Sequence, residues 1–254
     1  MDPQLPDLTG TVALVTGAGG GIGGGVAARF AAAGAAVVVH HRTSAARAAA
    51  VVADIVDRGG HAVAAQGDVA DPEECAAVVG VAVERFGRLD AVVAAAGVQP
   101  VADLAGMSPD EWQRVVDTNL TGSFTTVQAA VPVMSDGGSI TLIASVEGSR
   151  PARGHAHYSA SKAGMIMFAR SAALEYGGRG IRVNTVSPGL VDRDGLEDDW
   201  PSGVASWRRQ APLARLGTAS EVGDACVFLA SPMARWITGH DLVVDGGMSA
   251  VPAW

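Results

Sequence analysis

A glycine-rich run, Thr16-Gly-Ala-Gly-Gly-Gly-Ile-Gly23, separates an apolar run at 12–16 from a segment with helical spacing. Glycines let the backbone approach a ligand closely, and a helix that begins directly after them offers free N–H groups and the positive end of its dipole. In the helical segment, Ile22, Val26 and Phe30 recur every four residues, so they form one buried stripe. The run therefore predicts a strand, a phosphate-binding turn and a helix.

Working outward from this run, short apolar stretches alternate with helix-like segments along the whole chain. They are mostly rich in Val, Ile or Leu and continuously apolar, which is typical of strands covered on both faces. The predicted strands are 12–16, 36–40, 62–66, 91–96, 139–144, 182–187 and 242–245. This alternation predicts an α/β fold of the Rossmann-type, doubly wound kind: one domain over 1–254, with a seven-stranded, mostly parallel sheet and helices on both faces.

The composition narrows the possible partners and the compartment. The 254 residues carry 18 Lys plus Arg and 26 Asp plus Glu, a net charge of −8. Nucleic acids and anionic membranes need a basic surface, so we expect neither as a partner. Cys75 and Cys226 form no disulfide framework or CxxC metal site, which is typical of a reducing compartment. With no signal peptide visible from residue 1 onward, we expect a cytoplasmic protein without a bound metal.

The glycine run fits two spacings of a dinucleotide-binding loop. The spacing GxxxGxG uses Gly17, Gly21 and Gly23. The spacing GxGxxG is satisfied as well, starting at Gly19. In either register, its position between a strand and an amphipathic helix predicts that a pyrophosphate binds here.

The segment after the second predicted strand bears on which dinucleotide binds. NAD enzymes often place a carboxylate there, on the ribose hydroxyls, whereas here no Asp or Glu occurs before Asp54. Arg42 can pair with a 2′-phosphate, and Thr43 can donate a hydrogen bond to it. The alternative is that Arg42 is a solvated residue at the start of a helix. The segment favours NADP(H) over NAD(H).

Tyr158 and Lys162 are four residues apart and therefore share one helix face. A tyrosine that exchanges a proton near neutrality needs its pKa lowered by about three units, roughly 4 kcal/mol. A nearby ammonium acts in that direction. Such a pair alone is more often simply exposed, but Ser145 ends the fifth predicted strand, where its hydroxyl can donate to a carbonyl oxygen that gains charge. Asn119 lies inside a helical pattern that suits Asn poorly, which favours a polar role such as holding a water.

Together these residues resemble the short-chain dehydrogenase/reductase family, from about residue 8 to residue 247. The glycine run, with Ile22 between Gly21 and Gly23, matches the cofactor loop of that family. Asp68-Val69 matches the adenine-contacting pair of the family after the third strand, and Gly97 matches its glycine after the fourth strand. Pro188-Gly189 matches the turn that borders the nicotinamide. The catalytic tetrad is matched in order and spacing by Asn119, Ser145, Tyr158 and Lys162.

The resemblance implies a function and a role for each residue of the tetrad. It implies hydride transfer between a nicotinamide cofactor and a ketone or secondary alcohol, in a homotetramer. Tyr158 would be the general acid/base, and Ser145 would polarise the carbonyl. Lys162 would lower the pKa of the tyrosine and bind the nicotinamide ribose, while Asn119 would hold a water in a proton relay.

The sequence also departs from the family. Ala94-Ala95-Ala96-Gly97 stands where the family usually has Asn-Asn-Ala-Gly, and Leu190 follows the Pro-Gly turn where the family often has Thr nearby. The glycine run lacks the basic residue that NADP-preferring members often carry, which weighs against NADP(H). An epimerase or dehydratase, a non-catalytic dinucleotide sensor and a Rossmann-like methyltransferase are the alternatives. An epimerase or dehydratase has an added substrate domain, for which too few residues follow Gly189. A sensor or a methyltransferase would not need the complete tetrad that this chain carries.

The sequence indicates less about the residues that bind the substrate than about those that bind the cofactor. The stretch 190–210 follows the sixth strand at the edge where ligands bind, so we expect it to cover the substrate. Its Trp200 and Trp207 fit an apolar wall or the packing of a surface helix equally well. Glu147 and Gln99 could border the substrate, and we expect solvent or packing roles for the histidines on either side of the tyrosine, His155 and His157.

Overall fold

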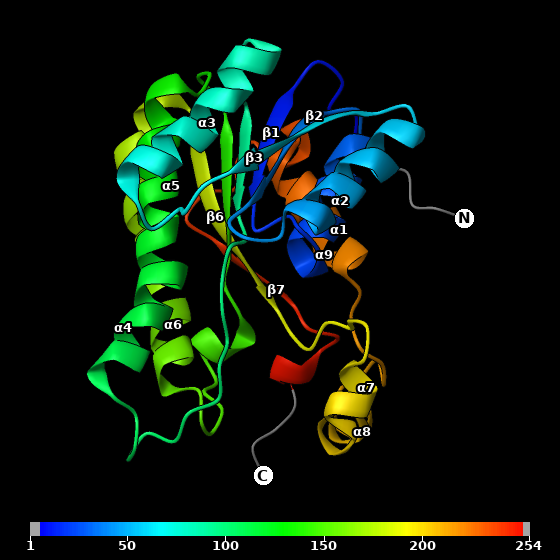
Figure 1. Cartoon of the computed structure of the whole chain (residues 1–254), viewed down its shortest axis with the longest axis vertical. Helices are drawn as coiled ribbons and strands as arrows, with labels where there is room; N and C mark the ends of the chain where they lie inside the picture. Colours follow the sequence, from blue (N-terminus) through cyan, green and yellow to red (C-terminus); the bar gives the residue numbers. More distant parts are fainter. Residues whose placement is uncertain (1–5, 251–254) are drawn as a thin grey trace.

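The computed structural model describes residues 6–250, so residues 1–4, which bear on the signal peptide, lie outside the described residues. Seven strands form one sheet in the order β3-β2-β1-β4-β5-β6-β7, and every neighbouring pair is parallel (Figure 1). The strands are β1 (Val12–Thr16), β2 (Ala36–His41), β3 (His61–Gln66), β4 (Ala91–Ala94), β5 (Ser139–Ile143), β6 (Arg182–Pro188) and β7 (Asp241–Val244). The predicted fold class and all seven predicted strands are confirmed, because each apolar run lies between two helical layers.

The ends of the strands differ from the prediction by one or two residues, and β4 shows why. Its apolar run continues to Ala96, but the strand ends at Ala94. The backbone N–H groups of Ala95 and Ala96 donate instead to the hydroxyl of Thr16, at 3.0 and 3.1 Å. A side chain of the glycine run thus turns the chain away from the sheet at this point.

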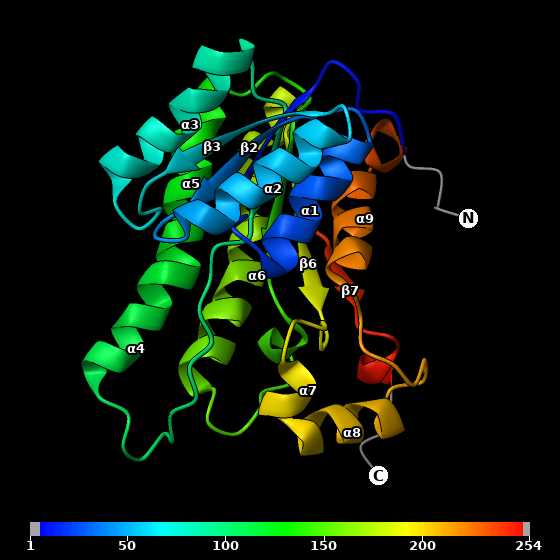
Figure 2. The same ribbon diagram turned by 45° about the vertical axis from the view of Figure 1, so that its right-hand side comes forward.

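Helices cover both faces of the sheet (Figures 1 and 2). One face packs against α3, α5 and α6, and the other against α1, α2 and α9, each with its own buried apolar cluster. The helices are α1 (Gly21–Ala32), α2 (Ala45–Asp57), α3 (Pro72–Phe86), α4 (Pro109–Val116), α5 (Gly122–Ala130), α6 (Ala156–Tyr176), α7 (Leu196–Asp199), α8 (Pro201–Gln210) and α9 (Ala219–Ala230). Of the predicted stripe of α1, Val26 and Phe30 are fully covered, and Ile22 is half-buried.

Local sequence signals fix where several helices begin. Asp71 caps α3 by accepting from the N–H groups of the first turn, and Ser108 and Thr218 form capping boxes at α4 and α9. The stretch 190–210 contains two helices, α7 and α8, and Pro201 occupies the first position of α8, a favoured place for proline. Short helices α7 and α8 lie beyond the ends of β6 and β7 (Figure 2).

The strand order places a ligand site at the centre of the sheet. The chain runs outward from β1 to β3 on one side and from β4 to β7 on the other, so the order reverses between β1 and β4. In open α/β sheets, ligands bind outside the carboxyl ends of the strands at this point. The glycine run after β1 and the chain after β4 meet there. Among residues 6–250, no helix has both the length and the apolar character needed to cross a bilayer.

Candidate active site

The glycine loop is held in the register of Gly17, Gly21 and Gly23. A Cβ on Gly17 would lie 2.7 Å from the Cα of Ala96, and one on Gly23 would lie 2.4 Å from the carbonyl oxygen of Gly17. Gly17 and Gly21 also have positive φ angles of 65° and 54°, which favour glycine. In the competing register, a Cβ on Gly24 would make only ordinary contacts. The close approach of backbone to backbone therefore requires the GxxxGxG spacing.

The N-terminus of α1 fits the diphosphate of a dinucleotide. No side chain caps this helix, and its first turn contains no acidic residue. The N–H groups of the first turn, which include those of Ile22 and Gly23, have no partner within the helix. A Cβ on Gly21 would meet open space, so the backbone is accessible there. Free N–H groups at a helix N-terminus attract a phosphate.

A buried histidine that the sequence analysis did not single out holds the glycine loop in place. The Nδ1 atom of His40 accepts from the N–H of Gly17 at 3.1 Å, and its Nε2 lies 2.9 Å from the carbonyl oxygen of Gly67. Nε2 must therefore carry the proton and donate it. Burial lowers the pKa of His40, so the neutral form that makes both bonds is favoured. The only signal in the sequence was a polar residue at the end of an apolar strand.

Arg42 lies where it was expected, at the end of β2, but it has a partner. Its Nη1 is 3.2 Å from Oδ2 of Asp68, and about half of the arginine side chain is exposed. Asp68 in turn accepts from the N–H of Ala70. The adjacent Val69 is buried, and its carbonyl accepts from the hydroxyl of Thr125. The predicted phosphate ligand and the predicted adenine-contacting pair thus lie side by side, with Thr43 next to Arg42.

Tyr158, Lys162 and Ser145 come together from two elements. Tyr158 and Lys162 lie on α6, and Ser145 follows β5. The Nζ of Lys162 lies over the tyrosine ring, 5.5 Å from its centroid, and donates to the carbonyl of Ile143 at 2.6 Å. The Ser145 hydroxyl hydrogen-bonds to the phenol and favours its ionisation. Lys162 is the only lysine in the chain, and it is 5% exposed.

Burial, rather than the ammonium, dominates the pKa of the phenol. It raises the pKa of Tyr158 to about 12, with a further increase from the Glu147 carboxylate, against the hydrogen bond from Ser145. The same burial lowers the pKa of Lys162 to about 8. The lowering of the Tyr158 pKa by Lys162 therefore stays a prediction, since in the protein alone burial keeps that pKa raised.

The pKa of Lys162 has a consequence for stability. Folded Lys162 loses its proton near pH 8, whereas the unfolded side chain keeps it to about 10.5. Unfolding therefore takes up a proton between these pH values, and stability rises with pH in that window. Relative to Lys162→Met, we expect wild type to gain about 2 kcal/mol between pH 8 and pH 10. Urea unfolding of both proteins measures the gain, and parallel stability curves would contradict it.

Asn119 is fully buried in a π-helical turn, η1 (Asp117–Thr121), between α4 and α5. Its Oδ1 accepts from the N–H of Val98 at 2.8 Å, while its Nδ2 donates to the carbonyl of Val98 and to the hydroxyl of Ser161. The side chain therefore ties the chain after β4 to α6. A Cβ on Gly97 would lie 3.2 Å from Oδ1 of Asn119 and 3.7 Å from Nζ of Lys162, so Gly97 borders the tetrad.

The turn Pro188-Gly189 and the helices that follow it lie at one side of the carboxyl edge of the sheet. Pro188 ends β6, and the N–H of Gly189 donates to Val244 of β7. A Cβ on Gly189 would lie 2.6 Å from the indole of Trp207, so this ring packs directly on the turn. Trp207 also packs on a small cluster within the segment, whereas Trp200 is half exposed. Glu197 of α7 pairs with Arg208 of α8.

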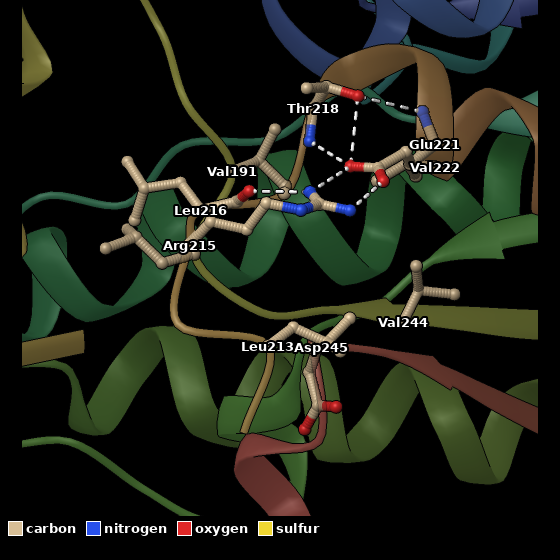
Figure 3. A pocket seen from close by; sticks show the side chains of 12 residues that line it. Val191, Leu213, Arg215, Leu216, Thr218, Glu221, Val222, Val244 and Asp245 are labelled. Carbon is tan, nitrogen blue, oxygen red and sulfur yellow. Dashed lines mark hydrogen bonds and ion pairs between the residues drawn. The ribbon is translucent and has the colours of Figure 1, made fainter. Parts of the chain in front are cut away.

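A cavity of about 110 Å³ lies behind this turn, between the segment after β6 and the start of α9 (Figure 3). The residues that line it include Leu190, directly after Gly189, and none of the tetrad. Of its three charged side chains, Arg215 and Glu221 pair with each other through two bonds, which hold the pKa of the Glu221 carboxyl at about 2. The third, Asp245, accepts from the N–H groups of Gly247 and Ser249. No cluster of three possible metal-ligating residues occurs within 6–250.

Comparisons with known proteins agree with this geometry. A family model described as enoyl-(acyl carrier protein) reductase matches residues 17–249. The 3-oxoacyl-[acyl-carrier-protein] reductase of Synechocystis sp. is 41% identical over 244 residues, 95% of this chain and 98% of that protein. A short-chain dehydrogenase/reductase from Serratia marcescens superposes with a TM-score of 0.90 at 35% identity, covering 95% of this chain and 99% of that one. A blue fluorescent protein from a metagenomic library, solved with NADPH, gives 0.89 at 33% identity, covering 96% and 99%.

Proposed function

The chain belongs to the short-chain dehydrogenase/reductase family, and we propose that Tyr158 is the general acid and base of its reaction. The chain is an NAD(P)-dependent oxidoreductase that transfers a hydride between a nicotinamide cofactor and a ketone or secondary alcohol. The observation that carries the proposal is the meeting of a half-buried tyrosine, a serine hydroxyl and the only lysine at the carboxyl edge of the sheet. This family leaves the methyltransferase alternative without support.

In the proposed reaction, each residue acts on a proton or on an oxygen. Tyr158 donates its proton to the carbonyl oxygen during reduction, and the high pKa of the buried phenol keeps that proton available at neutral pH. Ser145 donates to the same oxygen as charge develops on it. Lys162 binds the nicotinamide ribose and lies beside the ring of Tyr158. Asn119, whose amide is engaged by Val98 and Ser161, positions α6 against the chain after β4.

For the cofactor, we propose NADP(H) in preference to NAD(H). A dinucleotide supplies or accepts the hydride when bound. The glycine loop, Ile22 and the adjacent N–H groups would hold its diphosphate, and Arg42 and Thr43 would bind a 2′-phosphate. Support comes from the exposed half of the Arg42 side chain and from the NADPH-bound relative. The remaining proposed contacts are Asp68, Val69, Gly97, Pro188 and Gly189.

We propose that the protein is a homotetramer. Several large apolar side chains lie exposed on the helical surface, including Phe124 of α5, Met167 and Leu174 of α6, and Trp236, which is 97% exposed. Such side chains, when contiguous, mark interaction surfaces. We further propose a cytoplasmic location, supported by two buried free cysteines, and one functional domain in which 190–210 covers the substrate. Sedimentation should give four times 25.6 kDa, and a monomer mass would contradict the tetramer.

The proposed function is tested by a panel of ketones and secondary alcohols with reduced and oxidised NADP and NAD. We expect ketone reduction with NADPH, and slower reduction with NADH at equal concentrations. Turnover of no ketone and no secondary alcohol with any of the four cofactor forms would contradict the assigned activity. Equal kcat/KM values for NADPH and NADH would contradict the cofactor preference alone.

A further inference from the structure

Four polar side chains gather beside Tyr158 and play no part in the proton transfer proposed above. They come from three places at the carboxyl edge: the chain after β4, the short helix η3 (Val146–Gly148) after β5, and the start of α6. The Glu147 carboxylate lies at their centre, 2.9 Å from Nε2 of Gln99 and 3.0 Å from Nδ1 of His155. We call them the Glu147 cluster, which consists of Gln99, Glu147, His155 and Ser159.

The Glu147 cluster lies directly beside Ser145 and Tyr158. The backbone N–H of Glu147 donates to the hydroxyl of Ser145 at 3.1 Å. Glu147 is therefore held beside Ser145, the residue proposed above to bind the carbonyl oxygen. The ring of His155 lies edge-on to the ring of Tyr158, with 6.1 Å between centroids. The Glu147 charge is close enough to raise the pKa of the phenol. The expected packing role of His155 is thus accompanied by a hydrogen bond to the Glu147 carboxylate.

The carboxylate of Glu147 retains capacity for another donor. A carboxylate can accept about four hydrogen bonds, and here Gln99 and His155 supply two, while the Ser159 hydroxyl stands farther away at 3.5 Å. The side chains of Glu147 and His155 are each 17% exposed, so the cluster is neither sealed nor free in solvent. Its partners fix the carboxylate in place, which lowers the entropy lost when a ligand binds.

We propose that the Glu147 cluster binds a hydroxyl group that the substrate carries close to its reacting carbonyl, which makes hydroxyketones and polyols the preferred substrates. The inference rests on the proposed function, because it requires the carbonyl to lie at Ser145 and Tyr158. A hydroxyl both donates and accepts, so it can use the Glu147 oxygen and the Gln99 amide together. An ammonium only donates. A carboxylate or phosphate at this position would be repelled by Glu147.

The test compares ketones that differ only by a hydroxyl in place of a methyl group. Hydroxyacetone is paired with butan-2-one, and 4-hydroxybutan-2-one with pentan-2-one, at saturating NADPH. We expect wild type to favour the hydroxyketone of at least one pair by tenfold or more in kcat/KM, since a hydrogen bond to a charged group is typically worth this much. In Glu147→Met the ratio should fall to about one, and Glu147→Gln should lie between.

Two further variants show whether the preference depends on the Glu147 carboxylate itself. Glu175→Gln removes an exposed carboxylate at the far end of α6 and should leave the wild-type ratio unchanged. Gln99→Leu should reduce the ratio through loss of one partner of Glu147. A hydroxyketone preference that survives in Glu147→Met, or that is absent from wild type in both pairs, would overturn the inference while leaving the reductase activity intact.

If wild type reduces none of the four ketones, kcat/KM ratios cannot be measured, and calorimetry then decides the inference independently of turnover. Hydroxyacetone is titrated into wild type and Glu147→Met, each saturated with NADP⁺. Binding to wild type that is at least tenfold tighter supports the Glu147 cluster as a hydroxyl site. Equal binding, or no binding to either protein, overturns it.

Discussion

Replacing Tyr158 by phenylalanine is expected to lower kcat for ketone reduction by about 10²- to 10⁴-fold, the usual contribution of a positioned general acid. The variant keeps the aromatic ring, so the ring still faces Nζ of Lys162, which lies 5.5 Å from its centroid. Only the proton and its hydrogen bond with Ser145 are lost. NADPH affinity, measured by fluorescence titration, should remain within about threefold, because the glycine loop and Arg42 are untouched.

The matched control for this change is Tyr176→Phe. Tyr176 is the only other tyrosine in the chain and lies at the end of the same helix. The Tyr176→Phe variant loses the same hydroxyl at a position away from the tetrad, so its kcat should equal that of wild type. Reduction by Tyr158→Phe at a rate within tenfold of wild type would contradict the assignment of the acid. A matching loss in both variants would point to a defect of α6.

Arg42→Asp should produce the second large effect, a reversal of cofactor preference. We expect NADPH affinity to fall by 10²-fold or more, because a charge-assisted bond is lost and the new carboxylate repels the 2′-phosphate. The new carboxylate would also face Asp68, the present partner of Arg42 at 3.2 Å. NADH binding should be retained or improved, since a carboxylate at this strand end can accept from ribose hydroxyls. Kd values for both cofactors measure the outcome.

Arg58→Asp makes the same charge change just beyond α2, where the arginine is exposed and pairs with Asp54. It should leave the affinities for both cofactors unchanged. Equal NADPH affinity in wild type and Arg42→Asp would show that Arg42 is a solvated residue, the alternative that the sequence left open. Loss of affinity in both variants would instead reflect the long-range field of the protein.

The fold was predictable because two local signals agree with the global arrangement. Continuous apolar runs predict strands covered on both faces, and the glycine run after the first of them predicts a strand, a turn and a helix. Strand ends were less predictable, since β4 ends where Thr16, far away in the sequence, captures its N–H groups. The helices α7 and α8 were missed because Asp, Gly and Pro within 190–210 obscure the helical spacing.

The candidate site was predictable where spacing along one element decides it. Tyr158 and Lys162 share a helix face, and Ser145 ends a strand at the same edge, so their meeting follows from the fold. Contacts between elements were not predictable. The sequence carries no sign that Asn119 engages both backbone groups of Val98, or that Asp68 pairs with Arg42. Each depends on loops from different strands.

The balance between burial and charge at Tyr158 also lay beyond sequence reasoning. Spacing places Lys162 near the phenol, but only the structure shows that the ammonium lies over the ring and bonds to Ile143. Burial then raises the pKa of the phenol to about 12. A second positive charge is needed to bring it down, and an oxidised nicotinamide bound at the edge would provide one. In the protein alone, the phenol therefore keeps its proton at neutral pH.

The role of Tyr158 is tested most directly by the ultraviolet absorbance of its phenolate. In Tyr176→Phe, Tyr158 is the only tyrosine left, so absorbance near 295 nm between pH 7 and pH 10 reports on it alone. We expect almost no phenolate at pH 10 in the protein alone, as a pKa of about 12 requires, and a clear phenolate signal below pH 10 once NADP⁺ is bound. Half-ionisation at pH 10 without cofactor, or no response to NADP⁺, would contradict this role.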